Sequence, residues 1–314
     1  MSADLDIIQL GKTNLSISVV GIGAWSWGDR LFWGYGRAYR EPEVQAAFAA
    51  SLEAGVNWFD TAESYGSGQS ERLLGKFVYA VPGQVVVATK FMPYPWRLRR
   101  KELSRALRHS LQRLNLPCVD LYQVHWPFPP LPVETWAEGL AEVIEQGLVR
   151  AVGVSNYNEE QMRRAYLVLQ KHGLHLASNQ VEYSLINRKV EFNGLLKVCQ
   201  DLGVTLIAYS PLGQGVLTGK YSPENPPPGI RGRRYGRGVL ARALPLVRLM
   251  REIGHAHGSK TPSQVAINWL ICKGTVPIPG AKNARQAQDN AGAMGWRLTE
   301  AEVAALDEAS RVKS

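Results

Sequence analysis

Residues 85–125 read VVVATKFMPYPWRLRRKELSRALRHSLQRLNLPCVDLYQVH, and this stretch indicates how the chain is built. Its two ends, residues 85–90 and 119–125, are short apolar runs rich in β-branched residues, as in buried strands. Between them, residues 99–114 place apolar side chains three and four positions apart, which is typical of an amphipathic helix. Two strands joined by a helix pair in parallel through a right-handed crossover. The stretch therefore predicts a parallel sheet covered by helices.

The same alternation runs along most of the chain. The other predicted strands are residues 19–24, 57–60, 150–155, 177–182, 205–210 and 275–279. The other predicted helices are residues 42–54, 71–79, 133–145, 159–172, 191–202, 262–273 and 285–293. Strands followed by helices in such a series favour a closed (β/α)8 TIM barrel, an α/β fold, over an open doubly wound sheet. The open sheet has little support, because no G-x-G-x-x-G follows the first predicted strand.

Four segments lie outside this repeat. Residues 7–15 predict an N-terminal hairpin, and residues 299–310 predict an extra C-terminal helix. Residues 25–40 and 211–244 are long insertions, which in a barrel usually form loops at the catalytic rim. No linker divides the chain, so we expect a single barrel domain over residues 1–314.

Composition narrows the class of protein. Hydrophobic types make up 45% of the 314 residues and charged types 20%, which is typical of a folded domain. No apolar run approaches the roughly 18 residues of a membrane span, and no signal peptide is evident, so we expect a cytoplasmic protein without a membrane partner. The three cysteines, Cys118, Cys199 and Cys272, are widely spaced and predict core thiols rather than a disulfide or zinc site.

The excess of basic residues gives a net charge of +9 and falls in two clusters. The cluster at residues 97–108 opens and lines a predicted helix, so we interpret it as a solvated face. The cluster at residues 231–242 lies in a Pro- and Gly-rich segment without helical periodicity, where arginines are free to converge on a phosphate. Neither cluster carries interleaved aromatics or a binding motif, so we expect no nucleic-acid partner.

Three consecutive predicted strands end in ionisable groups, at Asp60, Lys90 and His125, and Tyr65 follows in the loop after Asp60. Because barrel active sites form at the carboxyl ends of strands, we expect these four side chains to meet. The Lys90 ammonium would lower the pKa of the Tyr65 phenol, Asp60 would orient the lysine, and His125 would bind a substrate oxygen. No metal-ligand cluster accompanies them, and the set suits reduction of a carbonyl group.

Here the sequence resembles the aldo-keto reductase family over about residues 10–307. The motifs that carry the resemblance are FDTAESYG (59–66), ATK (88–90), VHWP (124–127), GVSN (153–156), NQVEY (179–183), YSPL (209–212) and PGAK (279–282). The resemblance implies Asp60, Tyr65, Lys90 and His125 as catalytic residues and a nicotinamide cofactor. The chain looks closer to the branch that holds microbial and plant reductases and potassium-channel beta subunits than to the vertebrate branch.

The resemblance also implies a cofactor site. Its residues are Trp25, Ser155, Asn156, Gln180, Tyr209, Ser210, Leu212, Gly213, Gln214, Lys220, Arg231, Gly280, Lys282, Gln286, Asp289 and Asn290. Ser155, Asn156 and Gln180 would bind the carboxamide, and Tyr209 would stack on the nicotinamide ring. Lys282, with an arginine of residues 231–234, would attract a 2′-phosphate, which indicates NADPH/NADP+ rather than NADH.

The substrate is less defined by sequence. Trp25, Trp33 and Trp126 are predicted to bind it, with Trp27 and Phe32 as further aromatic candidates in the same rim loops. Similar proteins reduce small aldehydes, dicarbonyls, sugars or pyridoxal. We expect a monomeric, NADPH-dependent aldehyde or ketone reductase, with an oligomer left open. Two alternatives remain: a cofactor-binding regulatory subunit that acts through a protein partner, and a barrel that binds phosphosugars.

Overall fold

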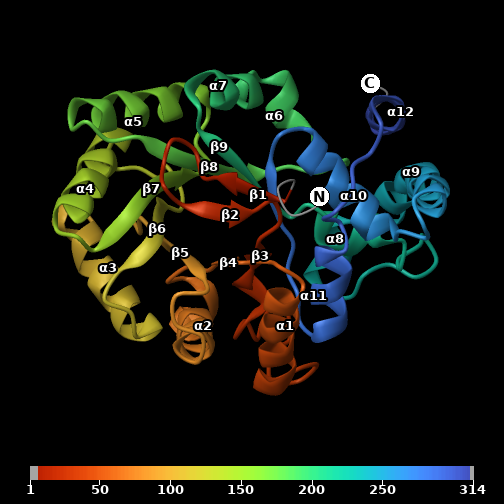
Figure 1. The fold of residues 1–314 in the computed structure, drawn as a ribbon, viewed down its shortest axis with the longest axis horizontal. Coiled ribbons are helices and arrows are strands. Elements are labelled where there is room, and N and C mark those ends of the chain that lie inside the picture. The colour runs from red at the N-terminus through yellow and green to blue at the C-terminus, as the bar shows by residue number, and fades with distance from the viewer. Residues whose placement is uncertain (1–5, 312–314) are drawn as a thin grey trace.

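The computed structural model describes residues 6–311, in which parallel strands form a barrel surrounded by helices (Figure 1). The strands pair in chain order: β3 (Ile22–Gly23), β4 (Trp58–Asp60), β5 (Val86–Phe91), β6 (Val119–Val124), β7 (Val149–Ser155), β8 (Leu176–Glu182), β9 (Thr205–Tyr209) and β10 (Val276–Ile278). The first and last strands meet through backbone hydrogen bonds, from Gly21 N to Pro277 O at 3.0 Å and from Gly23 N to Pro279 O at 3.1 Å. The predicted TIM barrel is therefore confirmed.

The helices cover the outside of the strands. They are α1 (Glu41–Glu53), α2 (Gln69–Tyr79), α3 (Lys101–Leu114), α4 (Val133–Glu145), α5 (Glu159–Lys171), α6 (Lys189–Phe192), α7 (Leu195–Leu202), α8 (Ile230–Arg234), α9 (Arg237–Ala256), α10 (Pro262–Cys272), α11 (Ala284–Ala291) and α12 (Glu300–Ala309). The helix predicted over residues 191–202 is in fact two, because Gly194 adopts a φ of +80° between α6 and α7. Within residues 6–311, none of the helices has the length and apolar character that a bilayer crossing needs.

The predicted N-terminal hairpin consists of β1 (Ile7–Gln9) and β2 (Ser16–Ser18), and it lies across one end of the barrel (Figure 1). Leu10, Leu15 and Ile17 pack into the same core cluster as the barrel residue Trp58, whose Nε1 donates to Ser18 O at 3.1 Å. The hairpin thus closes the amino end of the barrel. The first barrel strand is shorter than the predicted residues 19–24, because the chain bends at residues 19 and 20 and a 3-10 turn begins at Ala24.

The strand period of two residues explains why the barrel interior changes character along its axis. Trp58, Ala88 and Leu121 share one buried apolar cluster inside the barrel. Two residues further along the same strands come Asp60, Lys90 and Gln123, which are also buried. The polar layer therefore lies above the apolar one, toward the carboxyl ends of the strands.

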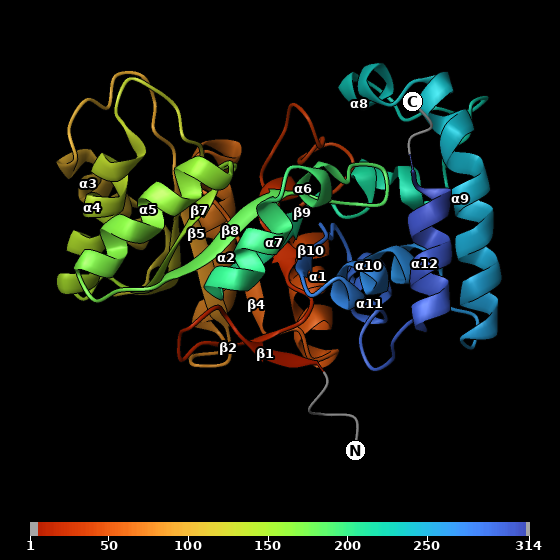
Figure 2. The ribbon, with the colours of Figure 1, turned by 90° about the horizontal axis from the view of Figure 1, so that it is seen from above.

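The segment at residues 211–244 differs from its prediction. It contains two short 3-10 turns within η4 (Gly213–Thr218), then α8, then the first part of the long helix α9. The prediction that this segment lacks helical periodicity is wrong from residue 237 onward. There, buried apolar residues recur at helical spacing, and the arginines do not belong to this buried set. Pro245 within α9 hides this pattern. Figure 2 shows α8 on the opposite side of the molecule from the hairpin.

Two smaller predictions concern core packing. Cys199 is buried as expected, but Cys118 and Cys272 are half-buried, and all three are free thiols. Trp27, predicted as a rim candidate, is fully buried, and its Nε1 donates to Ala281 O at 2.8 Å. Trp27 therefore belongs to the core. The single-domain expectation includes residues 1–5 and 312–314, which lie outside the described residues.

Candidate active site

A cavity of about 610 Å³ lies at the carboxyl ends of the strands. Of the residues predicted for catalysis, cofactor or substrate, those that line it are Trp25, Trp33, Asp60, Tyr65, His125, Trp126, Ser155, Asn156, Gln180, Tyr209, Ser210, Leu212, Gln214, Lys220, Arg231, Gly280, Lys282, Gln286, Asp289 and Asn290. Four predicted residues do not line it: the aromatic candidates Trp27 and Phe32, together with Lys90 and Gly213. Lys90 is buried behind the wall, and Gly213 is buried in the turn after β9, where an added Cβ would clash with the Ile186 side chain.

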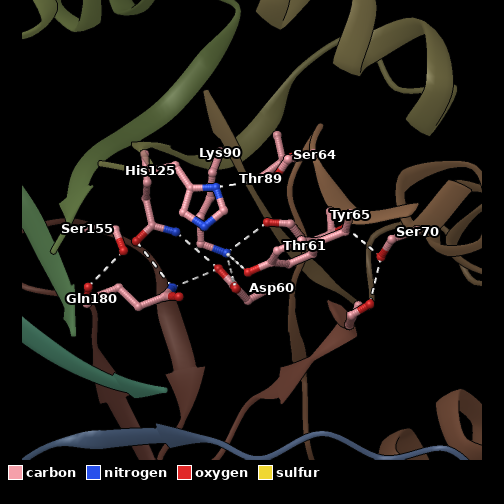
Figure 3. A network of polar contacts seen from close by, with 12 residues as sticks. Asp60, Thr61, Ser64, Tyr65, Ser70, Thr89, Lys90, His125, Ser155 and Gln180 are labelled. Carbon is pink, nitrogen blue, oxygen red and sulfur yellow. Dashed lines mark hydrogen bonds and ion pairs between the residues drawn. The ribbon is translucent and has the colours of Figure 1, made fainter. Parts of the chain in front are cut away.

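The floor of the cavity holds a buried ion pair between Lys90 and Asp60 (Figure 3). Lys90 Nζ also donates to Thr61 O at 2.9 Å, and the Tyr65 hydroxyl lies 3.5 Å away. Asp60 Oδ2 accepts from Gln123 Nε2 and from Gln180 Nε2, each at 3.0 Å. Buried charges are tolerated when their partners and hydrogen bonds are complete, as they are here.

The Tyr65 phenol stays protonated in this setting. Burial raises the pKa of Tyr65 well above 10, and the Asp60 carboxylate raises it further. Burial also lowers the pKa of Lys90, against the opposing effect of Asp60. The expected lowering of the Tyr65 pKa is therefore not met in this structure, because burial, and after it the Asp60 carboxylate, raise that pKa. The side chain is therefore a protonated phenol, able to donate a proton, and not a phenolate.

His125 lies beside Tyr65, with the two ring centroids 5.6 Å apart and nearly perpendicular. Burial lowers the pKa of His125 well below 6.5, and the Lys90 charge lowers it further. The ring is therefore neutral near pH 7. Its Nδ1 lies 3.5 Å from Ser64 Oγ, a residue that sequence reasoning did not single out. A neutral imidazole keeps one N–H for donation to a ligand oxygen.

The loop that carries Tyr65 is held by contacts that sequence reasoning missed. Glu63 Oε1 accepts from Met92 N at 2.7 Å, and Arg97 Nη2 donates to Glu63 Oε2 at 3.0 Å. The Arg97 guanidinium also lies 4.8 Å from the Phe91 ring. Arg97 thus contacts the loop that carries Tyr65 and is not part of a solvated helix face. The position of Glu63 inside the FDTAESYG motif was the one sequence feature that could have indicated this contact.

A second interaction fixes the turn after Tyr65. Gly66 has a φ of +54°, which favours glycine, and a Cβ there would lie 2.7 Å from Gly28 O. The loop after β4 therefore packs directly against the first rim loop.

The middle of the cavity joins the ends of β6, β7, β8 and β9. The Asn156 side chain donates to His125 O at 3.0 Å and accepts from the Tyr209 hydroxyl at 3.0 Å. Ser155 Oγ donates to Gln180 O at 2.8 Å. Gln180 uses its Nε2 on Asp60, and within residues 6–311 no protein donor reaches its Oε1. These contacts hold the wall formed by the Tyr209 ring.

The other end of the cavity is cationic. Burial lowers the pKa of Lys282 to about 8, and the neighbouring charges of Arg231 and Lys220 contribute to the same shift. Gln214 has a φ of +53°, and its buried Oε1 has no hydrogen-bond partner within the described residues. Strained and unpartnered groups of this kind gather at ligand sites.

Three further predicted cofactor residues contact the protein itself at this end. Gln286 Oε1 accepts from Lys282 N at 2.9 Å, Asn290 Nδ2 donates to Gly280 O at 3.3 Å, and Asp289 Oδ1 accepts from Thr261 Oγ1 at 2.8 Å. The first two contacts fix the loop between β10 and α11, and the third joins α11 to the start of α10.

Aromatic rings wall the cavity on the side of Asp60, Tyr65 and His125. Trp25 stacks on Phe32 with ring centroids 4.9 Å apart and lies 6.2 Å from the Tyr65 ring. Trp126 stacks on Phe128 at 5.3 Å. The described residues include no group of three or more His, Cys, Asp or Glu side chains that could hold a metal ion.

Comparison with known proteins places the chain among oxidoreductases built on a TIM barrel. The model of the aldo/keto reductase family matches residues 19–311, and the chain belongs to that family. Among curated relatives, the chloroplastic pyridoxal reductase of Arabidopsis thaliana is 46% identical over 310 residues, covering 95% of this chain and 84% of that protein. The methylglyoxal reductase YeaE of Escherichia coli is 32% identical, covering 94% and 92%.

Solved structures agree with this assignment. The glycerol dehydrogenase AKR11B4 of Gluconobacter oxydans is similar with a TM-score of 0.85 and 26% identity, covering 97% of this chain and 95% of that one. An aldo/keto reductase of Klebsiella pneumoniae in complex with NADP and acetate has a TM-score of 0.77 and 27% identity, covering 96% and 94%. The predicted family membership and enzyme class are confirmed. Because the Arabidopsis relative is chloroplastic, the cytoplasmic location stays a prediction, as does the monomeric state.

Proposed function

We propose that the protein catalyses the NADPH-dependent reduction of aldehydes or ketones to alcohols. One observation carries this proposal: a protonated phenol, Tyr65, lies 3.5 Å from the buried Lys90 ammonium at the floor of a cavity that leads to three cations. The first feature suits proton donation to an oxygen that gains negative charge. The second suits a phosphorylated nucleotide.

The residues present fit NADPH along the length of the cavity. The exposed part of the Tyr209 ring offers a face to the nicotinamide, and Gln180 Oε1 is available for its carboxamide. Lys220, Arg231 and Lys282 would hold the phosphates, and Gln214 Oε1 needs a donor. The Klebsiella relative crystallised with NADP supports the same cofactor. When bound, NADPH supplies the hydride for the carbonyl carbon.

The residues of this chain then handle the proton. Tyr65 donates its hydroxyl proton to the carbonyl oxygen, which becomes an alkoxide as the carbonyl is reduced. The alkoxide accepts this proton readily because it is a much stronger base than a phenolate. Lys90, held charged by Asp60, stabilises the tyrosinate left behind. The neutral His125 donates an N–H to the same substrate oxygen and orients it. The roles of Tyr65, Asp60 and His125 are the ones that the sequence predicted, whereas Lys90 acts on the tyrosinate that forms and does not lower the pKa of the resting phenol.

A flat aromatic aldehyde is the substrate class that we favour, with pyridoxal as its best candidate. The Trp25 ring is 6.2 Å from the Tyr65 ring, and Trp126 follows His125 directly, so aromatic walls flank the proposed proton donor. Such walls favour a planar ring by stacking and apolar contact. The 46% identity to a pyridoxal reductase supports the same choice over the dicarbonyls and sugars.

Two measurements on the purified protein test this function. NADPH should quench tryptophan fluorescence saturably, and the loaded protein should oxidise NADPH when pyridoxal or an aromatic aldehyde is added. We expect kcat/KM to be higher for pyridoxal than for methylglyoxal or glyceraldehyde. Binding of NADPH without turnover of any carbonyl would instead indicate the regulatory subunit, which the named relatives do not favour. Phosphate affinity without nicotinamide binding would indicate the phosphosugar barrel.

A further inference from the structure

An ion pair joins the loop that carries Tyr65 to the segment that follows the strand of Lys90. The Arg97 guanidinium donates to both carboxylate oxygens of Glu63, from Nη1 to Oε1 and, at 3.0 Å, from Nη2 to Oε2. Glu63 precedes Tyr65 by two residues, and Arg97 follows β5. Because the guanidinium and the carboxylate are both planar, two parallel hydrogen bonds fix their relative orientation as well as their distance.

The same two side chains also bind the backbone at the end of β5. Glu63 Oε1 accepts from Met92 N at 2.7 Å, and Arg97 Nη1 donates to Met92 O at 2.7 Å. The backbone N–H of Glu63 donates to Lys90 O at 3.3 Å. Glu63 is thus hydrogen-bonded to the chain on both sides of Phe91, through its backbone on one side and its carboxylate on the other.

The pair is largely shielded from water. The side chains of Glu63 and Arg97 are 9% and 18% exposed, respectively. The Arg97 guanidinium carbon lies 4.8 Å from the centroid of the Phe91 ring and 5.2 Å from that of the Tyr94 ring. A shielded ion pair gains little net stability, because the loss of hydration offsets much of the attraction. The main contribution of this pair is therefore the geometry that it fixes.

The proton transfer proposed for Tyr65 needs such geometry. The Tyr65 hydroxyl lies 3.5 Å from Lys90 Nζ (Figure 3). Tyr65 begins the 3-10 segment η3 (Tyr65–Gly68), outside the barrel strands, so strand register does not set this distance. On one side of Tyr65, the loop packs against the first rim loop at Gly66. On the other side, the contacts of Glu63 hold it. A misplacement of about 1 Å can lower a rate about 10²-fold.

We propose that Arg97 is a positioning residue for the reduction: by holding Glu63 against the end of β5, it keeps the Tyr65 hydroxyl beside the Lys90 ammonium. This inference rests on the proposed function. Arg97 is not among the residues that line the cavity, so it acts through Glu63 and not by contact with substrate or nucleotide. Loss of Arg97 should therefore slow proton transfer and leave nucleotide binding unchanged.

The decisive variant is Arg97→Met, which keeps an unbranched chain between the aromatic rings but removes the guanidinium. At saturating NADPH, the single-turnover rate of aldehyde reduction should fall about tenfold, because the proton donor is no longer held in place. The solvent deuterium isotope effect on this rate should rise, because proton transfer then limits the reaction more strongly. The dissociation constant of NADPH should stay within about twofold of wild type.

Two further variants test the route through Glu63. Glu63→Gln keeps an acceptor for Met92 N but removes the ion pair, so its rate should match that of Arg97→Met. The double variant should be no slower than either single variant, because all three lack the same interaction. Arg97→Lys keeps the charge without the planar fork and should restore only part of the rate. Arg99→Met is the matched control, because Arg99 is exposed in the same segment.

Thermal unfolding is recorded for each variant, and Glu63→Gln with Arg97→Lys decides the question if Arg97→Met does not fold. A wild-type single-turnover rate in the folded variants would overturn the role of Arg97. So would an unchanged isotope effect, or losses in the two single variants that multiply in the double variant. These results leave the proposed function standing if the wild type reduces aldehydes, whereas a wild type that reduces none would refute the proposed function itself.

Discussion

The two ends of the cavity differ in how their charged side chains are paired. At the floor, the Lys90 ammonium is paired with Asp60, and Asp60 accepts two further hydrogen bonds. At the far end, Lys282 and Arg231 face the Trp33 ring instead of a carboxylate. The first arrangement is complete in the protein itself, whereas the second needs an anion. The end with the Lys90–Asp60 pair, where we propose that catalysis occurs, is therefore preorganised, and the cationic end, where we propose that the nucleotide binds, is left with charge that a ligand would neutralise.

The two ends of the cavity also differ in the secondary structure that carries their charged residues. Asp60 and Lys90 lie on β4 and β5 inside the barrel, where the strand register fixes them. Lys220, Arg231 and Lys282 lie in the segments after β9 and β10. Groups on rigid strands suit chemistry that needs exact geometry, and groups on rim segments suit binding and release. Changes at the two ends should thus affect different kinetic constants.

The largest effect is expected from Tyr65→Phe, which removes the proton donor at the preorganised end. General acid catalysis contributes about 10²–10⁴-fold, so kcat should fall by that factor. NADPH affinity should stay within twofold, because no cation at the far end changes. Steady-state kinetics with pyridoxal and an NADPH titration check both statements. A variant that keeps near wild-type kcat would show that Tyr65 is not the donor.

The next largest effect is expected from Lys282→Ala at the cationic end. Loss of one partner in a partly buried charge pair costs about 2 kcal/mol, so NADPH should bind roughly 30-fold more weakly and NADH much less so. Lys197→Ala is the control, because Lys197 lies on the exposed face of α7. Comparable losses for NADPH and NADH, or a wild type that prefers NADH, would contradict the assignment of Lys282 to a 2′-phosphate.

The pH dependence of NADPH binding provides a further test of the cationic end of the cavity. In the free protein burial and the neighbouring cations lower the pKa of Lys282 to about 8, and a bound phosphate would raise that pKa again. NADPH binding should therefore take up a proton near pH 8, and affinity should fall as the pH rises above 8. Calorimetry in buffers of different ionisation enthalpy measures this uptake. Lys282→Arg should abolish the uptake, because arginine stays charged throughout this range.

A smaller effect is expected from Arg234→Ala. Arg234 Nη2 donates to Glu182 Oε1 at 2.6 Å, so it ties α8 to the end of β8 at the cavity wall. The pair is half exposed on the arginine side, and such pairs contribute up to about 1 kcal/mol. Because this pair holds α8 against β8 at the cavity wall, its loss should let NADP+ leave about two- to fivefold faster in stopped-flow experiments. Arg233→Ala, at an exposed position of the same helix, should leave the off-rate unchanged.

Sequence patterns were sufficient for the parts of the molecule that follow a period. The barrel and the convergence of Asp60, Tyr65 and Lys90 follow from apolar runs that end in polar residues. Helix α9 was missed because Pro245 interrupts its pattern. The position of Trp33 among the cations, and the Arg97 contact with Glu63, depend on loop conformations that no period encodes. The preorganised end was therefore more predictable than the binding end.

The separation of the two ends is tested most directly by the single-turnover rate of Lys282→Ala loaded with saturating NADPH and mixed with pyridoxal. Once the nucleotide is bound, Tyr65, Lys90, Asp60 and His125 are unchanged, so the rate should lie within about twofold of wild type. A loss as large as that of Tyr65→Phe would show that the cationic end takes part in the chemistry and would contradict the account.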